Sequence, residues 1–294
     1  MHSQAKPTVA ITGASGFLGK ILTEHFSGIG WDVIALVRES SRYVSSKNIS
    51  YREYDLSKPP DSDILNGSTY LVHAAYIKKD AEHPKAATVN IKAAKELLRL
   101  SRQQNIIKNV FISSMSAHSD AMSSYGQQKV AIEKLFNSSR DISLRPGLII
   151  GNGGIVKDMS SFMKTKHAVP LIGGGRQPVQ IVSVHDMAVA VERALQSNLS
   201  GVLTIANQKV YSYKDFYTQL AEHLGVTVFF IPVPFFVMSL ILNLADLLHI
   251  KTVVGSDNLL GLRKLRSTDT LGDLVKLSLN PSPLKQALSK ERVR

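Results

Sequence analysis

Three glycines, each separated by two residues, set the strongest limit on how this chain can fold. Residues 8–19 read TVAITGASGFLG, so a β-branched run typical of a strand leads into glycines at 13, 16 and 19. Gly13 can take a tight turn, Gly16 leaves room for a pyrophosphate beside the backbone, and Gly19 lets a following helix pack against the strand. The first N–H groups of that helix would then face phosphate oxygens. The segment predicts a dinucleotide-binding turn, although its G-x-x-G-x-x-G spacing is shifted from the commoner G-x-G-x-x-G.

The first half of the chain alternates strand-like and helix-like segments. We predict strands near 8–12, 32–37, 50–54, 69–74, 108–114 and 141–146, and helices over 16–29, 84–104 and 124–139. Within the second helix, Ala94, Leu97, Leu98 and Ser101 fall on one face. Only the polar connection 38–48 shows no clear helix. The alternation favours an α/β fold of the Rossmann type, with a doubly wound parallel sheet covered on both faces.

Beyond Pro146 the pattern changes to glycine-rich turns, short strands and separate helices. We therefore expect a dinucleotide-binding domain over 1–150, to which a later segment at about 176–206 returns. Residues 151–294 would mainly form a smaller, mixed α/β region that binds the substrate. The apolar stretch Val228–Ile250 is interrupted by two prolines and falls short of the ~20 residues that a membrane-spanning helix needs. We expect it to form a buried or groove-lining helix rather than a membrane contact.

Charge and residue counts narrow the classes of partner. The formal net charge of +12 favours anionic partners. The tight basic cluster at 263–266 has no interleaved aromatic residues, so we expect no nucleic acid. The chain has no cysteine, which excludes disulfides and cysteine-based metal sites, and no group of His, Asp and Glu has the spacing of metal ligands. A polar N-terminus without an apolar signal core and the lack of cysteine together favour the cytoplasm.

A second motif, Tyr125-Gly-Gln-Gln-Lys129, could carry chemistry. The two side chains lie four residues apart on a predicted helix and therefore on one face. A phenol has a pKa near 10, and a cation one turn away lowers it toward neutrality. Ser114, at the end of the preceding predicted strand, could hold a substrate oxygen against the phenol. The same pair also arises by chance on helices, so it gains weight only from the glycine turn upstream.

Taken together, these residues resemble the extended short-chain dehydrogenase/reductase family, also described as the NAD-dependent epimerase/dehydratase family. Its members mostly act on nucleotide sugars. Besides Thr12–Gly19, the resemblance rests on Asp55-Leu56, Val72–Ala75, Asn90, Leu144–Gly147 and His185–Ala188, in that order along the chain.

The resemblance implies roles for individual residues. Ser114, Tyr125 and Lys129 would be catalytic, with Ser116 as the reserve for the serine and as a substrate contact. Arg176 and Arg263 would contact an anionic part of the substrate. The expected cofactor contacts are Gly13, Ser15, Gly16, Phe17, Leu18, Gly19, Arg38, Asp55, Leu56, Ala74, Ala75 and Lys129. Members that dehydrate sugars place an Asp-Glu pair after the catalytic Ser or Thr; Met115 and Ser116 stand there in this chain, which disfavours dehydration.

The end of the second predicted strand bears on the cofactor. An acid there would bond the ribose hydroxyls of NAD, but this chain has Arg38, which can pair with a 2′-phosphate. We therefore expect NADP(H), with NAD(H) still possible because Glu39 follows.

The leading hypothesis is an NADPH-dependent reductase of a keto group on a nucleotide-diphosphate sugar. An NAD-dependent sugar 4-epimerase would use the same residues, and a non-catalytic NADP-binding regulatory protein is a third alternative. Relatives also reduce more apolar carbonyl compounds. They often form homodimers through the helices that correspond to Ala93–Leu100 and Tyr125–Phe136.

Overall fold

The protein is described by a computed structural model that covers residues 6–78, 85–247 and 255–290. The chain forms two compact units. Unit 1 contains Met1–Ser114, Gln128–Arg145 and Met187–Leu203, and unit 2 contains Met115–Gln127, Pro146–Asp186 and Thr204–Arg294. Helix α3 (Ser124–Glu133) begins in unit 2 and continues into unit 1.

Unit 1 is built on a seven-stranded sheet of order β11-β6-β5-β4-β1-β2-β3. The six strands from β6 to β3 pair in parallel. The strands span Thr8–Thr12 (β1), Asp32–Val37 (β2), Ile49–Glu53 (β3), Tyr70–His73 (β4), Lys108–Ile112 (β5), Asp141–Pro146 (β6) and Gly201–Ile205 (β11). Central strands are apolar on both faces because helices cover both, as expected of a parallel sheet. Ala10 of β1, for example, is fully buried between its partners Ile34 and Leu71.

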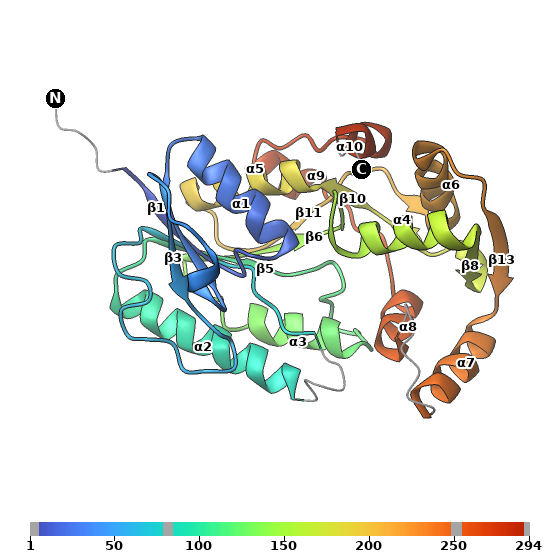
Figure 1. Cartoon of the computed structure of the whole chain (residues 1–294), viewed down its shortest axis with the longest axis horizontal. Helices are drawn as coiled ribbons and strands as arrows, with labels where there is room; N and C mark the ends of the chain where they lie inside the picture. Colours follow the sequence, from blue (N-terminus) through green and yellow to red (C-terminus); the bar gives the residue numbers. More distant parts are fainter. Residues whose placement is uncertain (1–5, 79–84, 248–254, 291–294) are drawn as a thin grey trace. The chain divides into compact units, whose positions relative to one another are not determined.

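Helices cover both faces of this sheet (Figure 1). Helices α1 (Phe17–Gly28) and α5 (Val184–Gln196) lie on one face, where His25 and Glu192 are joined at 2.7 Å. Helices α2 (Ala86–Gln103) and α3 lie on the other face, and their apolar side chains share one cluster with Phe111 of β5. These positions confirm the Rossmann-type α/β fold predicted from the sequence.

Most predicted elements of unit 1 are confirmed, with differences at their ends. The predicted face of α2 is buried, including Ala94 and Leu97. The predicted 84–104 helix begins within the described residues at Ala86, and its first predicted residue lies outside them. The predicted 108–114 strand ends at Ile112, and the predicted 124–139 helix ends at Glu133. The polar 38–48 connection contains only the 3₁₀ turn η1 (Ser40–Arg42).

Unit 2 is a mixed α/β region with three two-stranded sheets. Its strands are β7 (Leu148–Ile150), β8 (Ala168–Ile172), β9 (Pro178–Val179), β10 (Ile181–Ser183), β12 (Tyr211–Ser212) and β13 (Phe229–Val233). Its helices are α4 (Gly154–Lys166), η2 (Gly173–Gly175), α6 (Tyr213–Leu224), α7 (Phe235–Leu247), α8 (Ser256–Arg263), α9 (Leu271–Lys276) and α10 (Leu284–Lys290). A core around Phe216, Leu220 and Leu284 joins α4, α6 and α10.

The apolar stretch 228–250 forms two elements in its described part. Strand β13 pairs in parallel with β8, and α7 follows. Residues 248–250 lie outside the described residues. Helix α7 buries Met238 and Leu242 but leaves Phe236 and Leu240 exposed, so it is not wholly buried. It lines a groove, which was one of the two arrangements expected from the sequence. Among the described helices, none combines the length and apolar character needed to cross a bilayer.

Candidate active site

The glycine turn has the geometry that the sequence predicted. Gly13 has φ of +70°, and a Cβ there would lie 2.9 Å from the Cα of Ala75. A Cβ on Gly19 would lie 2.0 Å from the carbonyl oxygen of Gly13, so only glycine allows α1 to approach the turn this closely. Gly16 is the N-cap of α1, and no described side chain caps this end. The first N–H groups of α1 have no acceptor within the helix, which suits them to hold a pyrophosphate.

The floor of this turn is fixed by Thr12 at the end of β1. Its hydroxyl oxygen accepts hydrogen bonds from the N–H groups of Ala74 and Ala75, both at 3.1 Å, just after β4. With both lone pairs used, the hydroxyl donates its proton to Nδ1 of His73 at 2.9 Å. Burial, together with the charge of Lys129, lowers the pKa of His73 to about 3. His73 is therefore a neutral, packed strand residue rather than an acid or base at neutral pH.

Lys129 is held deep inside unit 1. Its side chain is 4% exposed, and Nζ donates to the carbonyl oxygen of Ile112 at 2.7 Å. The ammonium also lies 4.7 Å from the ring centre of Phe111 and 5.1 Å from that of Tyr76. Burial lowers the pKa of Lys129 to about 7, against an opposing effect of Glu133. A lysine with such a pKa can hold or release a proton at neutral pH, a property typical of functional sites.

An ion pair between Glu133 and Arg145 engages Ser113, the first of the two serines that follow β5. Glu133 accepts two hydrogen bonds from the Arg145 guanidinium, at 2.8 and 2.6 Å, and a third from the Ser113 hydroxyl at 2.5 Å. Ser113 is thus tied to a structural network. Ser114 is half-buried, and its catalytic role stays a prediction. The network also fixes the end of α3 that follows Lys129.

Asn90 joins three segments of unit 1. Its side-chain amide exchanges two hydrogen bonds of 2.9 Å with the backbone of Ile77, beyond β4. It also donates to Gln128 of α3 at 3.0 Å. Asn90 therefore fixes Gln128, the neighbour of Lys129, relative to the loop that follows β4. These contacts link α2 to the loop after β4 and to α3.

Tyr125 lies in the first turn of α3, in unit 2, and is half-buried. The start of this helix is capped from far along the chain: the carboxylate of Asp257, in α8, accepts from the N–H of Ser124 at 2.5 Å and from that of Tyr125 at 3.2 Å. Gly126 packs so closely that a Cβ there would lie 2.4 Å from the carbonyl oxygen of Ser116. The sequence analysis missed Asp257, because no local pattern links it to a helix about 130 residues earlier.

The end of β2 carries the residues that bear on cofactor choice. Arg38 is exposed directly after the strand. The acid that follows it is engaged elsewhere, because Glu39 pairs with Arg42 at 2.5 Å. Nearby, Asp55 accepts two hydrogen bonds from Ser57. Burial alone would raise the pKa of Asp55, but these bonds and the charges of Lys58 and Arg38 outweigh it and lower the pKa.

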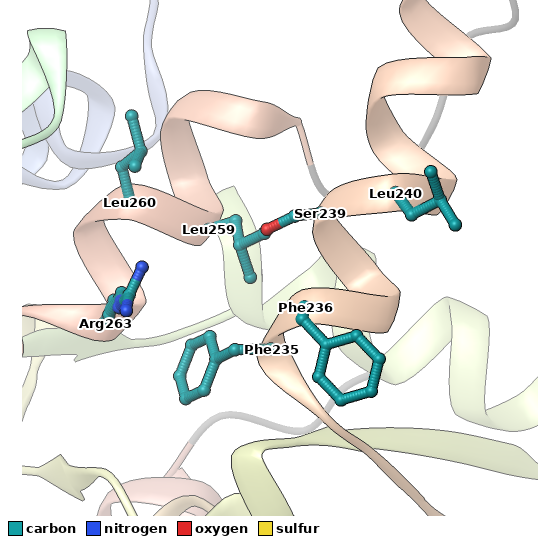
Figure 2. A pocket seen from close by; sticks show the side chains of 7 residues that line it. All are labelled: Phe235, Phe236, Ser239, Leu240, Leu259, Leu260 and Arg263. Atoms are coloured by element: carbon teal, nitrogen blue, oxygen red, sulfur yellow. The ribbon is translucent and has the colours of Figure 1, made fainter.

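The predicted site residues are divided between the two units. Unit 1 holds the glycine turn with Ser15, Phe17 and Leu18, together with Arg38, Asp55, Leu56, Ala74, Ala75, Ser114 and Lys129; unit 2 holds Ser116, Tyr125, Arg176 and Arg263. Arg176 is exposed beside η2, and Arg263 lines an apolar groove between α7 and α8 (Figure 2). In the described ranges, no group of three or more His, Asp or Glu side chains is placed to hold a metal ion.

Comparisons with known proteins identify the family of the chain. A family model described as "NAD dependent epimerase/dehydratase family" matches residues 9–206. The curated ceramide reductase of Caulobacter vibrioides is 28% identical over 158 residues, which are 52% of this chain and 50% of that protein. The chain spans about half the length of the curated relatives it matches.

Solved structures resemble the chain over nearly its whole length. The UDP-N-acetylglucosamine 4-epimerase of Bacillus cereus has a TM-score of 0.74 at 18% identity, covering 97% of this chain and 95% of its own. The Bordetella bronchiseptica enzyme WbmG, solved with NAD and UDP, has a TM-score of 0.75 at 16% identity, covering 98% and 94%. At these identities the likeness establishes the fold.

Proposed function

The chain belongs to the NAD-dependent epimerase/dehydratase family, and within it we propose an NADPH-dependent reductase of a keto group on a nucleotide-diphosphate sugar. Membership makes the chain an NAD(P)-dependent oxidoreductase or epimerase. The reductase assignment is supported chiefly by one observation. Arg38 is exposed at the end of β2 while the adjacent acid Glu39 is paired with Arg42, so a cation rather than a carboxylate is available to a ribose substituent.

The residues around the glycine turn fit a dinucleotide. The N–H groups at the start of α1 would hold the pyrophosphate, and Arg38 would pair with the 2′-phosphate. Asp55 and Leu56 would flank the adenine. When bound, NADPH would supply the hydride.

Tyr125 would donate its hydroxyl proton to the carbonyl oxygen of the substrate, and Ser114 would donate a hydrogen bond to the same oxygen. The Lys129 ammonium would stabilise the phenolate that remains and would also bond the nicotinamide ribose. Both Tyr125 and Lys129 are in the continuous helix α3, four positions apart, which puts them on one face. Arg176, with Arg263 as the second candidate, would pair with the anionic part of the substrate.

A variant that reverses the preference between NADPH and NADH tests the proposal. The wild-type protein should bind NADPH much more tightly than NADH, and Arg38→Asp should reverse that order because the carboxylate repels a 2′-phosphate and bonds ribose hydroxyls. Lys285→Asp is the matched control, because Lys285 is an exposed cation on α10 and is not among the proposed cofactor contacts. Equal affinities of the wild-type protein for the two cofactors would remove the main support for a reductase.

An NAD-dependent 4-epimerase is the second candidate, favoured by the family description and by the catalytic residues it would share with a reductase. Cofactor stoichiometry separates the two: a reductase consumes one NADPH per product, whereas an epimerase shows no net change. Mass spectrometry of co-purifying ligands would identify the cofactor and the substrate class. Tyr125→Phe should abolish turnover in both cases while cofactor binding persists, and unchanged turnover would exclude Tyr125 as the proton donor.

Homodimer formation through α2 and α3 is a further proposal, which sedimentation velocity tests directly.

A further inference from the structure

Helix α7 is apolar on both of its faces. One face packs into unit 2, where Met238 and Leu242 join Ile172 and Leu259 in a buried cluster. The opposite face is exposed, with Phe236 at 75% and Leu240 at 61% of their full accessible surface, and it continues through Ile241 and Leu244. A helix that has already buried one apolar face in its own core does not ordinarily present a second such face to water.

A groove of about 400 Å³ connects this face to α8. Its walls are Phe235, Phe236, Ser239 and Leu240 from α7, and Leu259, Leu260 and Arg263 from α8 (Figure 2). Of the described residues that line it, Arg263 alone is charged. Figure 2 shows the Arg263 side chain on the α8 side and Leu240 on the α7 side, with Leu259 and Ser239 between them and the rings of Phe235 and Phe236 below. A groove with apolar walls and one guanidinium suits an acyl chain that ends in a phosphate.

The charged residue in the sequence of α7, Asp246, comes next to its last residue, Leu247, and the charged residue that lines the groove is the cation Arg263. Residues 225–245 contain no Asp, Glu, Lys or Arg. Arg263 lies on the α8 side of the groove. The acid at the start of α8, Asp257, faces α3 instead. The whole chain carries a net charge of +12.

We propose that the exposed face of α7, with the groove that it forms with α8, docks onto an anionic phospholipid bilayer. Exposed Phe and Leu side chains beside a cation, on a chain of positive net charge, are a combination that binds such a surface. A second copy of the chain fits less well. Each copy carries a net charge of +12, so two copies repel each other, whereas an anionic bilayer attracts that charge. The proposal does not depend on the reaction that the enzyme catalyses.

Flotation with lipid vesicles tests the proposal on the full chain. The wild-type protein should bind phosphatidylglycerol-containing vesicles more strongly than phosphatidylcholine vesicles, and salt should weaken the binding. The double variant Phe236→Asp/Leu240→Asp should lose at least about tenfold in affinity, since it removes two large apolar contacts and adds two like charges. Val44→Asp/Val275→Asp is the matched control, because these side chains are 91% and 65% exposed elsewhere, and it should bind as the wild type does.

A second measurement covers the case in which the double Asp variant does not fold. Phe236→Trp places a fluorophore on the docking face, and brominated phosphatidylglycerol in the vesicles should quench its added emission relative to the wild-type protein. Binding of the folded double variant equal to wild type, or an unquenched signal from the introduced tryptophan in bound protein, would overturn the proposal. So would a wild-type protein that ignores vesicles and sediments as a dimer that the double variant splits, because a second copy would then be the occupant.

Discussion

Replacing Asp257 with Ala removes the carboxylate that caps the start of α3 and so tests how Tyr125 is positioned. Two hydrogen bonds are lost, to the N–H groups of Ser124 at 2.5 Å and of Tyr125 at 3.2 Å. Loss of a helix cap costs about 0.5–2 kcal/mol, and a hydrogen bond to a charged group contributes about 1.5–3 kcal/mol. Because the start of α3 is half-buried, water can replace part of the loss, and we expect a destabilisation of about 1–2 kcal/mol. The larger effect should fall on turnover, since fraying of this turn displaces the proposed proton donor.

Asp215→Ala is the matched control for this experiment. Asp215 forms a capping box with Ser212 at the start of α6, which carries none of the proposed site residues. Thermal unfolding should report a similar loss for both variants, about 2–4 °C per kcal/mol for a chain of this size class. Turnover should fall at least about tenfold in Asp257→Ala alone, which corresponds to about 1.4 kcal/mol of lost transition-state stabilisation. Equal turnover in the two variants would refute the argument that Asp257 positions Tyr125.

Three further outcomes follow from the site. Gly19→Ala should destabilise the fold by about 1–3 kcal/mol, because its Cβ would clash with the Gly13 carbonyl, whereas Gly28→Ala at the other end of α1 meets nothing within 4 Å and should be neutral or stabilising in urea unfolding. The pKa of His73 is about 3 in the fold and about 6.5 when unfolded, so its contribution is present above pH 6.5 and is lost as pH falls below it. At pH 5.5 the wild-type protein should have lost about 1.4 kcal/mol that His73→Gln does not lose, and parallel melting curves of the two across pH 5–7 would contradict this. The pKa of Lys129 is lowered to about 7, so its ammonium is lost as pH rises through 7. Cofactor affinity from fluorescence titration should weaken over that range in the wild-type protein but not in Lys129→Met, and an identical pH profile would argue against contact between Lys129 and the cofactor.

The sheet could be predicted from sequence because its signal is local. A parallel strand covered on both faces is a continuous apolar run, as in Val33–Val37. The turn after β1 is indicated by its three spaced glycines. Ends were predicted less well. Ser113 still donates its N–H to Leu144 beyond the last residue of β5, and α3 gives way after Glu133 to tighter turns at Leu135 and Phe136. Such ends depend on contacts made elsewhere in the fold.

The contacts that shape the candidate site could not be predicted from the sequence. Periodicity put Tyr125 and Lys129 on one helix face. The Lys129 ammonium donates to the backbone carbonyl oxygen of Ile112, and such a contact cannot be inferred from residue type because every residue has a backbone carbonyl. Asp257 reads as an ordinary helix-start acid of α8, and only the tertiary fold turns its carboxylate toward α3. The exposure of α7 was equally hidden, because Phe and Leu look the same in a sequence whether buried or exposed.

Helix α3 is held by two independent sets of contacts, and each set fixes a different proposed role. In unit 1, Asn90 bonds Gln128 and Arg145 bonds Glu133, so these contacts fix the part of the helix that carries Lys129. In unit 2, Asp257 fixes the first turn, which carries Tyr125. Loss of the first set should therefore weaken cofactor binding, and loss of the second should slow proton transfer while cofactor binding persists. A helix with separate anchors at its two ends would let Tyr125, the proposed proton donor, be adjusted without moving the buried Lys129 ammonium.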